Sequence, residues 1–354
     1  MKVLALNSSP RKDEESYTAM MLKYLVEGMR EAGAEVEVVN LREKKIKNCI
    51  GCFTCWSKTP GQCVHNDDMT NDLFPKWLVC DLVIYASPLY YHSMNASMKA
   101  FIERTLPAAL PFFEQGDDGM TFHPLRDKIP ASVLLSVCGF PEASEFNAML
   151  EFLTRTSHKY ANPVAAICRA GASLLSMPFH ESKAKDVLNA TRQAGRELIN
   201  TLKIAPETLS RITQPLGDVQ SFANMGNMYW KTCINEGVTP KEFEDKKMVP
   251  RPETLADFMF LLPFGIDAKA VGDRKVQLQI KFSGDVNESC YFTIEKGSVN
   301  ARQGACEKPD LTIDTPFNVW MDILTHKADG AKMLMEQKYK VAGDLSLMMQ
   351  IFRK

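Results

Sequence analysis

Five short apolar runs, each followed by a helical pattern, constrain the fold of this chain more than any other feature. A run such as residues 3–6, with no alternation of polar side chains, is typical of a strand buried on both faces of a parallel sheet. The runs are residues 3–6, 36–41, 82–86, 129–137 and 164–167. Five strand and helix repeats predict a doubly wound α/β domain with a five-stranded parallel sheet.

The rest of the chain predicts a second domain. With 354 residues, the chain exceeds the size at which a single core keeps growing. Residues 206–250 have a helical periodicity interrupted by glycines, whereas apolar and polar residues alternate from Val276 to Phe282, as in strands with one buried face. We therefore predict an α/β domain at 1–205, a helical connector at 206–250 and an α+β domain at 251–354.

Polar side chains follow the first strand where it meets its helix. In an open parallel sheet, a loop that leads from a strand into a helix N-terminus offers N–H groups and a favourable dipole to a phosphate. The candidates are Ser8, Ser9, Arg11, Ser16 and Thr18. The alternative is an ordinary turn in which Ser16 caps the helix. The loop matches neither the Walker pattern nor G-x-G-x-x-G.

The loops after the third and fourth strands predict a site for a planar ring at the same edge of the sheet. An aromatic-rich loop stiffened by proline offers flat apolar contacts and backbone amides. The candidates are Ser87, Pro88, Leu89, Tyr90 and Tyr91 after the third strand, with Cys138 and Gly139 after the fourth. The alternative is an exposed loop that covers a helix end.

Four of the ten cysteines lie within fifteen positions of the loop after the second strand. Two residues separate Cys49 from Cys52 and Cys52 from Cys55, and seven residues separate Cys55 from Cys63. Thiolates at this spacing can converge on one centre, and an evenly spaced run is typical of iron–sulfur ligation. The alternatives are zinc, or thiols that pack or form a redox disulfide beside a cofactor. Because parallel strands share an edge, we expect this loop beside the phosphate loop.

Charge and hydropathy exclude several classes of partner. A net charge of −1 without any basic run makes nucleic acid an unexpected partner. No apolar run approaches ~18 residues and the N-terminus lacks a signal pattern, so we expect no membrane span and a cytoplasmic location. In the cytoplasm, the cysteines would serve metal binding, redox chemistry or packing.

No acidic or basic side chain stands out as catalytic. The insert at 107–128 could form a lid or a subunit contact.

The first two hundred residues resemble the flavodoxin-like NADPH-dependent FMN reductases and, among them, the iron-sulfur flavoproteins. Three motifs carry the resemblance: Asn7-Ser8-Ser9-Pro10-Arg11 with Ser16 and Thr18, Ser87-Pro88-Leu89-Tyr90 with the helix that ends in Glu103-Arg104, and the cysteine run. The resemblance implies that FMN phosphate binds Ser9, Arg11, Ser16 and Thr18. It also implies that the flavin ring lies against residues 88–91, near Cys138 and Gly139. A 4Fe-4S cluster on Cys49, Cys52, Cys55 and Cys63 and electron supply from NAD(P)H or ferredoxin follow from the same resemblance.

The last hundred residues resemble the sterol-carrier-protein fold. The match rests on Gln277-Leu278-Gln279, on the segment Lys308-Pro309-Asp310-Leu311-Thr312-Ile313, on a helix through Trp320, and on Lys340-Val341-Ala342-Gly343-Asp344. The resemblance implies an apolar ligand or a role in assembly.

Two functions therefore compete. The first is an FMN-dependent oxidoreductase with a 4Fe-4S cluster, which we expect to be a homo-oligomer because flavodoxin-like reductases need a wall over the flavin edge. The second is a carrier of an apolar molecule with a flavodoxin-like scaffold or redox sensor and no cluster. Convergence of two loops and the cysteine run on one sheet edge favours the oxidoreductase.

Overall fold

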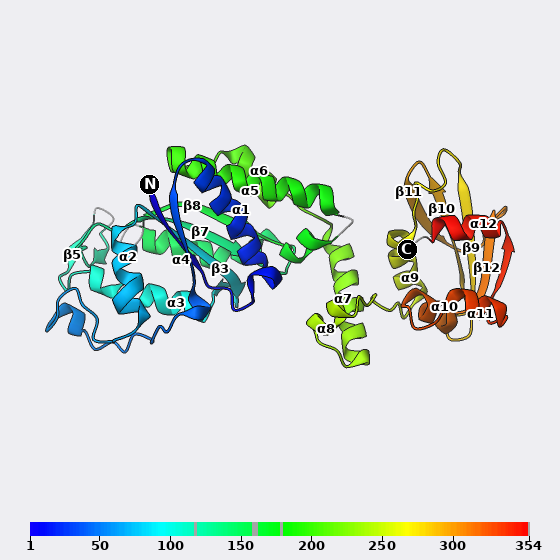
Figure 1. Cartoon of the computed structure of the whole chain (residues 1–354), viewed down its shortest axis with the longest axis horizontal. Helices are drawn as coiled ribbons and strands as arrows, with labels where there is room; N and C mark the ends of the chain where they lie inside the picture. Colours follow the sequence, from blue (N-terminus) through cyan, green and yellow to red (C-terminus); the bar gives the residue numbers. More distant parts are fainter. Residues whose placement is uncertain (117–118, 158–161, 178–179, 353–354) are drawn as a thin grey trace. The chain divides into compact units, whose positions relative to one another are not determined.

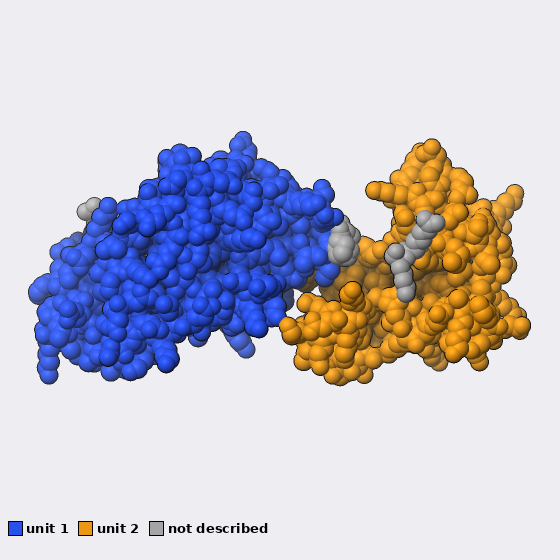
Figure 2. All heavy atoms as spheres, in the orientation of Figure 1, with its two compact units in different colours: residues 1–218 blue, residues 219–354 orange. Residues whose placement is uncertain are grey.

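The structure is a computed structural model that describes residues 1–116, 119–157, 162–177 and 180–352 (Figure 1). The chain divides into two compact units, residues 1–218 and 219–354 (Figure 2). The segment expected to be a connector, residues 206–250, is divided between them, since α6 (Pro206–Thr213) belongs to unit 1 whereas α7 (Val219–Glu236) and α8 (Pro240–Asp245) belong to unit 2. No helix in the described ranges is long and apolar enough to cross a membrane.

Unit 1 is built on a sheet whose five main strands are all parallel. They run in the order β2 (Glu35–Asn40), β1 (Lys2–Asn7), β3 (Leu82–Tyr90), β7 (Ala131–Val137), β8 (Asn162–Arg169). This is the flavodoxin-like order. The predicted fold class of this unit is confirmed, and β7, which lies between β3 and β8, is buried along its whole length, as its unbroken apolar run requires.

Helices cover both faces of this sheet (Figure 1). On one face, α2 (Phe74–Val79), α3 (Ala96–Glu103) and α4 (Asn147–Ser157) pack their apolar side chains against β1, β3 and β7. On the other, α1 (Tyr17–Glu31) packs against α5 (Glu181–Thr201). These two helices approach so closely that a Cβ at Gly28 would lie 1.8 Å from the Arg192 carbonyl oxygen, so glycine is required there.

Short elements complete unit 1 between these helices and strands. They are η1 (Asp13–Glu15), η2 (Leu41–Glu43), η3 (Thr54–Trp56), the π-helix η4 (Met69–Leu73), β4 (Ser93–Met94), η5 (Leu106–Ala108), β5 (Glu114–Gln115), β6 (Thr121–Phe122), η6 (Ala143–Phe146) and η7 (Ala172–Ser176). The insert at 107–128, of which 117–118 lie outside the described residues, contains the antiparallel pair β5–β6. Its His123 ring contacts Trp56 of the cysteine loop at a centroid distance of 4.7 Å and an interplanar angle of 52°, so the insert packs on that loop.

Unit 2 combines a mixed sheet with helices, which confirms the predicted α+β class. The strand order is β11 (Ser298–Gln303), β10 (Ser289–Glu295), β9 (Val276–Ser283), β12 (Leu311–Pro316), β13 (Lys340–Gly343), and only β9 and β12 are parallel. The remaining helices are α9 (Leu255–Gly265), α10 (Phe317–Leu324), α11 (Gly330–Met335) and α12 (Leu345–Ile351). Phe258 of α9 contacts Phe282 and Phe292 at centroid distances of 4.9 and 5.9 Å, so aromatic rings fill this core.

Candidate functional site

Three loops meet at the carboxyl edge of the unit 1 sheet. The backbone N–H and the hydroxyl of Ser8 both donate to the Ala86 carbonyl, at 2.9 and 3.1 Å, which joins the loop after β1 to β3. The hydroxyl of Ser136 on β7 donates to the Ser87 carbonyl at 2.8 Å. The structure thus brings the candidate phosphate loop together with both candidate ring loops.

The candidate phosphate loop is closed by its own hydroxyl groups. Ser16 donates to the Ser9 hydroxyl at 2.7 Å and accepts from the backbone N–H of Ala19 at 3.1 Å, which caps α1. The Arg11 backbone N–H donates to the Ser9 hydroxyl at 3.3 Å. Ser8, Ser9, Ser16 and Thr18 are buried, whereas the Arg11 side chain is exposed. The loop is therefore a preformed polar turn with the exposed Arg11 guanidinium at its rim.

The first ring loop is a tight hairpin between β3 and β4. Its two turn residues, Tyr91 and His92, have φ values of 48° and 59°, although side chains disfavour this region. Tyr90 and Tyr91 are exposed, whereas Ser87 and Pro88 are buried and Leu89 is half-buried. His92 Nδ1 lies 3.3 Å from the Glu145 carboxylate, which ties the hairpin tip to η6. The strained turn therefore presents the aromatic rings of Tyr90 and Tyr91 to solvent at the end of β3.

The second ring loop follows β7. The Cys138 thiol is buried and donates to the Phe140 carbonyl at 3.3 Å, so its side chain is turned into its own loop. Burial raises the pKa of this thiol. Gly139 is exposed, so a bound ring would meet the backbone of this loop rather than the thiol.

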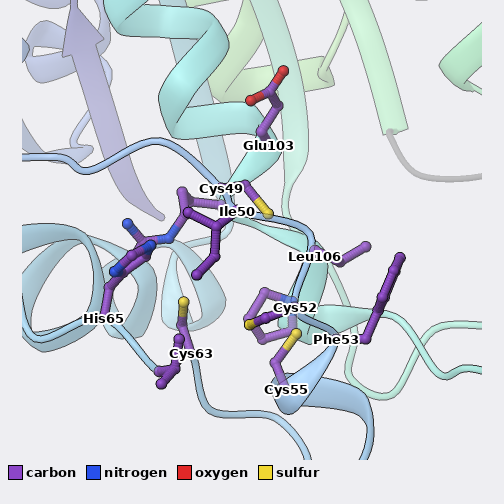
Figure 3. Close-up of a pocket in the computed structure, with 12 residues that line it drawn as sticks. Cys49, Ile50, Cys52, Phe53, Cys55, Cys63, His65, Glu103 and Leu106 are labelled. Atoms are coloured by element: carbon purple, nitrogen blue, oxygen red, sulfur yellow. The ribbon is translucent and has the colours of Figure 1, made fainter.

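All four clustered cysteines line one pocket (Figure 3). Figure 3 shows the sulfur atoms of Cys49, Cys52, Cys55 and Cys63 turned toward a common space. Positive φ values at Gly51 and Phe53, 64° and 53°, let the backbone curl between the thiols. The structure thus brings together the four residues that the sequence singled out as metal ligands.

The thiols of this pocket differ in their surroundings. Hydrogen bonds from Thr54 lower the pKa of the exposed Cys52 thiol. Burial, together with the neighbouring Cys63, raises the pKa of the Cys55 thiol. Within the described residues, no group of three or more His, Cys, Asp or Glu side chains is close enough together to hold a single metal ion.

A buried ion pair closes the base of the cysteine loop. Arg104 donates from Nη1 and Nη2 to the two oxygens of Asp67, at 2.8 and 3.0 Å, and both side chains are 2% exposed or less. Asp67 also accepts from the backbone N–H of Lys47 at 2.9 Å. Burial opposes ionisation of Asp67, but the hydrogen bonds from Arg104 outweigh it and hold the pKa of this carboxyl well below its usual range.

The cysteine pocket does not lie beside the phosphate loop, contrary to our expectation. Its wall includes Arg104, Leu106 and Pro107, which follow the C-terminal end of α3, whereas Asn95 at the N-terminal end of α3 donates to the Ser8 carbonyl at 2.5 Å. The eight residues of α3 separate the two places by about 12 Å. The start of the loop does reach the candidate phosphate loop, where Arg42 donates to the Arg11 carbonyl at 3.1 Å.

Sequence reasoning missed three residues that organise these loops. Asn95 caps α3, because its side-chain oxygen accepts from the Met98 N–H at 3.2 Å. Its own backbone N–H donates to the Ser87 hydroxyl at 3.1 Å, which joins α3 to the first ring loop. An asparagine directly before an apolar helix is a cap signal that could have identified it. Asp67 precedes a helix and carries a similar cap signal, and it accepts from the Thr70 N–H at 3.1 Å. No pattern predicts its buried pairing with Arg104, because a charge near a helix end is ordinarily exposed.

Two family models match the chain in the regions where its motifs predict a family resemblance. Residues 1–140 match the family described as NADPH-dependent FMN reductase, and residues 266–353 match the SCP-2 sterol transfer family. The predicted resemblance to both families is confirmed.

Individual proteins are similar to parts of the chain. An iron-sulfur flavoprotein of Archaeoglobus fulgidus is 42% identical over 107 residues, 30% of this chain and 46% of that protein. One of Methanocaldococcus jannaschii is 31% identical over 112 residues, 32% of this chain and 55% of that protein. The chain thus spans about half the length of these curated relatives. In the structure of an NAD(P)H:quinone oxidoreductase from Methanothermobacter marburgensis, the match has a TM-score of 0.44 at 18% identity, covering 56% of this chain and 96% of that one.

Proposed function

We propose that the chain is an FMN-dependent oxidoreductase that receives electrons from NAD(P)H or ferredoxin and carries a 4Fe-4S cluster. The observation that carries the proposal is the meeting of three loops at one sheet edge, through Ser8, Ser87 and Ser136. Open α/β sheets bind their ligands at this edge. The family match of residues 1–140 supports FMN as the ligand.

The loops at this edge of the sheet have side chains that suit the two ends of FMN. Ser9, Ser16 and Thr18 place hydroxyl groups at the first turn of α1, whose dipole favours a phosphate, and Arg11 adds a cation at the rim. Tyr90 and Tyr91 offer flat faces to an isoalloxazine ring, and the exposed backbone at Gly139 offers polar groups to its edge.

The cysteine pocket suits an iron–sulfur cluster better than zinc. Zinc sites usually combine two separated pairs of cysteines, whereas an evenly spaced run such as Cys49, Cys52 and Cys55 is typical of iron–sulfur ligation. In this pocket all four thiols line a common space. The names of the curated relatives point the same way.

The residues of the chain would bind and orient these groups rather than react themselves. When bound, FMN supplies hydride and single-electron chemistry, and a cluster supplies single-electron transfer. No catalytic acid or base is assigned to the chain. Unit 2, which matches the SCP-2 family, would hold an apolar ligand or serve assembly, and we propose a homo-oligomer whose second copy covers the flavin edge.

Loss of FMN phosphate contacts tests the flavin site. Replacing Arg11 and Ser16 together with alanine should weaken FMN binding by about 1.5–3 kcal/mol for each lost charge-assisted hydrogen bond. Equilibrium titration of the flavin-free protein with FMN, followed by flavin fluorescence, measures this change. Lys12→Ala is the matched control, because it removes a neighbouring cation that is outside the motif.

An unchanged FMN affinity in the double variant would refute the phosphate assignment. The alternative function, an apolar-ligand carrier without flavin, would gain support if the purified full chain released no FMN on heating but bound fatty acid.

A further inference from the structure

Arg104 has one more hydrogen-bond donor than its surroundings use. Nη1 donates to the Lys47 carbonyl at 2.7 Å and to Asp67 at 2.8 Å. Nη2 donates to Asp67 at 3.0 Å and to the Thr70 hydroxyl at 2.8 Å. Four of the five N–H groups of the guanidinium therefore have acceptors.

The fifth donor, Nε, is buried and has no hydrogen-bond acceptor among the described residues. Leaving such a donor unpaired in the interior costs about 1–3 kcal/mol, and orphaned buried groups are uncommon in folded proteins. The other four bonds fix the guanidinium, so Nε cannot turn to solvent. This fixed N–H group therefore has room for one acceptor at the wall of the cysteine pocket.

The candidate acceptor is a sulfur atom. Arg104 and Cys63 line the cysteine pocket together, and they also line a neighbouring groove of about 440 Å³, so the two residues share one wall. Burial would lower the pKa of Arg104, but hydrogen bonding to Asp67 and the proximity of Cys63 raise it. Among arginines, only Arg104 lines this pocket in the part of the chain that the structure describes.

We propose that Arg104 is a positioning residue whose Nε–H donates to the sulfur of Cys63 when the cluster is bound, and that this bond raises the reduction potential of the cluster. The inference rests on the proposed function. A donor aimed at a ligating sulfur stabilises the extra negative charge of the reduced state, and hydrogen bonds to sulfur are among the determinants of cluster potential. Because Asp67 neutralises the guanidinium, the N–H group itself would carry the effect.

The same guanidinium holds both ends of the cysteine loop. Lys47 precedes Cys49 by two residues, and Asp67 follows Cys63 by four. Lysine at position 104 would keep the charge but could not form this fork, because a compact ammonium has no planar bidentate geometry and no Nε–H. Arg104→Lys therefore removes the Nε–H group but keeps the positive charge.

The test uses the full chain after anaerobic reconstitution with iron and sulfide. The midpoint potential of the cluster is measured by a redox titration followed by electron paramagnetic resonance. We expect a lower midpoint in Arg104→Lys than in wild type, with FMN content unchanged. Arg126→Lys is the matched control. Arg126 belongs to the insert and lies beside Gly61 of the cysteine loop, but it does not line the pocket. The cluster of this variant should have the same midpoint potential as that of wild type.

A second measurement uses wild-type protein and therefore does not require that a variant folds. In reduced wild-type protein with ¹⁵N-labelled arginine, the inference expects a hyperfine coupling between one arginine nitrogen and the cluster. Equal midpoints in wild type and in iron-replete Arg104→Lys, or absence of this coupling, overturn the inference but leave the cluster in place. Wild-type protein that retains no iron overturns the inference and the cluster together.

Discussion

Replacing Cys52 with serine is expected to abolish iron binding while FMN stays bound. Cys52 lines the common pocket with the other three cysteines, and its thiol is the one whose pKa hydrogen bonds from Thr54 lower, which suits a ligand that must be deprotonated. Serine keeps the size of the side chain but is a poor iron ligand. The candidate flavin loops lie at the other end of α3, so we expect the substitution to remove no contact to FMN.

Chemical analysis of iron, sulfide and FMN after anaerobic reconstitution measures both effects. Cys306→Ser is the control, because Cys306 is a free thiol in unit 2, and its iron content should equal that of wild type. Wild-type iron content in Cys52→Ser would remove this residue from the ligand set.

Asp67→Asn is expected to destabilise unit 1 by about 3–5 kcal/mol at pH 7, because it leaves the Arg104 guanidinium buried without a counter-charge. Urea unfolding of iron-free protein, followed by circular dichroism, measures this loss without a contribution from the cluster. Asp68→Asn is the matched control. Asp68 accepts one backbone N–H, from Lys45 at 2.6 Å, and an asparagine oxygen can replace that acceptor.

The ion pair of Asp67 with Arg104 also predicts how the free energy of unfolding changes with pH. The pKa of Asp67 is lower in the folded than in the unfolded protein, so the unfolded protein binds more protons in acid. The stability contributed by this carboxylate is complete above the unfolded pKa of about 3.9 and falls as the pH drops below it. The difference in unfolding free energy between wild type and Asp67→Asn should therefore shrink from pH 5 to pH 3. A constant difference would show that ionisation of Asp67 does not contribute.

The five strands of the unit 1 sheet could be predicted because short unbroken apolar runs are typical of strands in a parallel sheet. The run from residue 129 to 137, for example, is β7, which begins at Ala131 and lies inside the sheet between β3 and β8. The candidate flavin loops followed from the same pattern, since loops at the carboxyl ends of neighbouring parallel strands have to meet.

The place of the cysteine pocket could not be predicted in this way. Topology fixes where a loop begins, and Arg42 does lie beside the phosphate loop. Where the loop ends depends on side-chain contacts: Arg104 draws Lys47 and Asp67 to the C-terminal end of α3, and Trp56 packs against His123 of the insert. Such contacts join residues far apart in sequence and leave no periodic signal.

The content of FMN, iron and sulfide in anaerobically reconstituted wild-type protein tests the central claim most directly. The account predicts about one FMN, four iron atoms and four sulfides for each chain. Addition of NADPH should then bleach the flavin absorbance. Protein that binds FMN but no iron would contradict the cluster, and protein that binds neither would contradict the account as a whole.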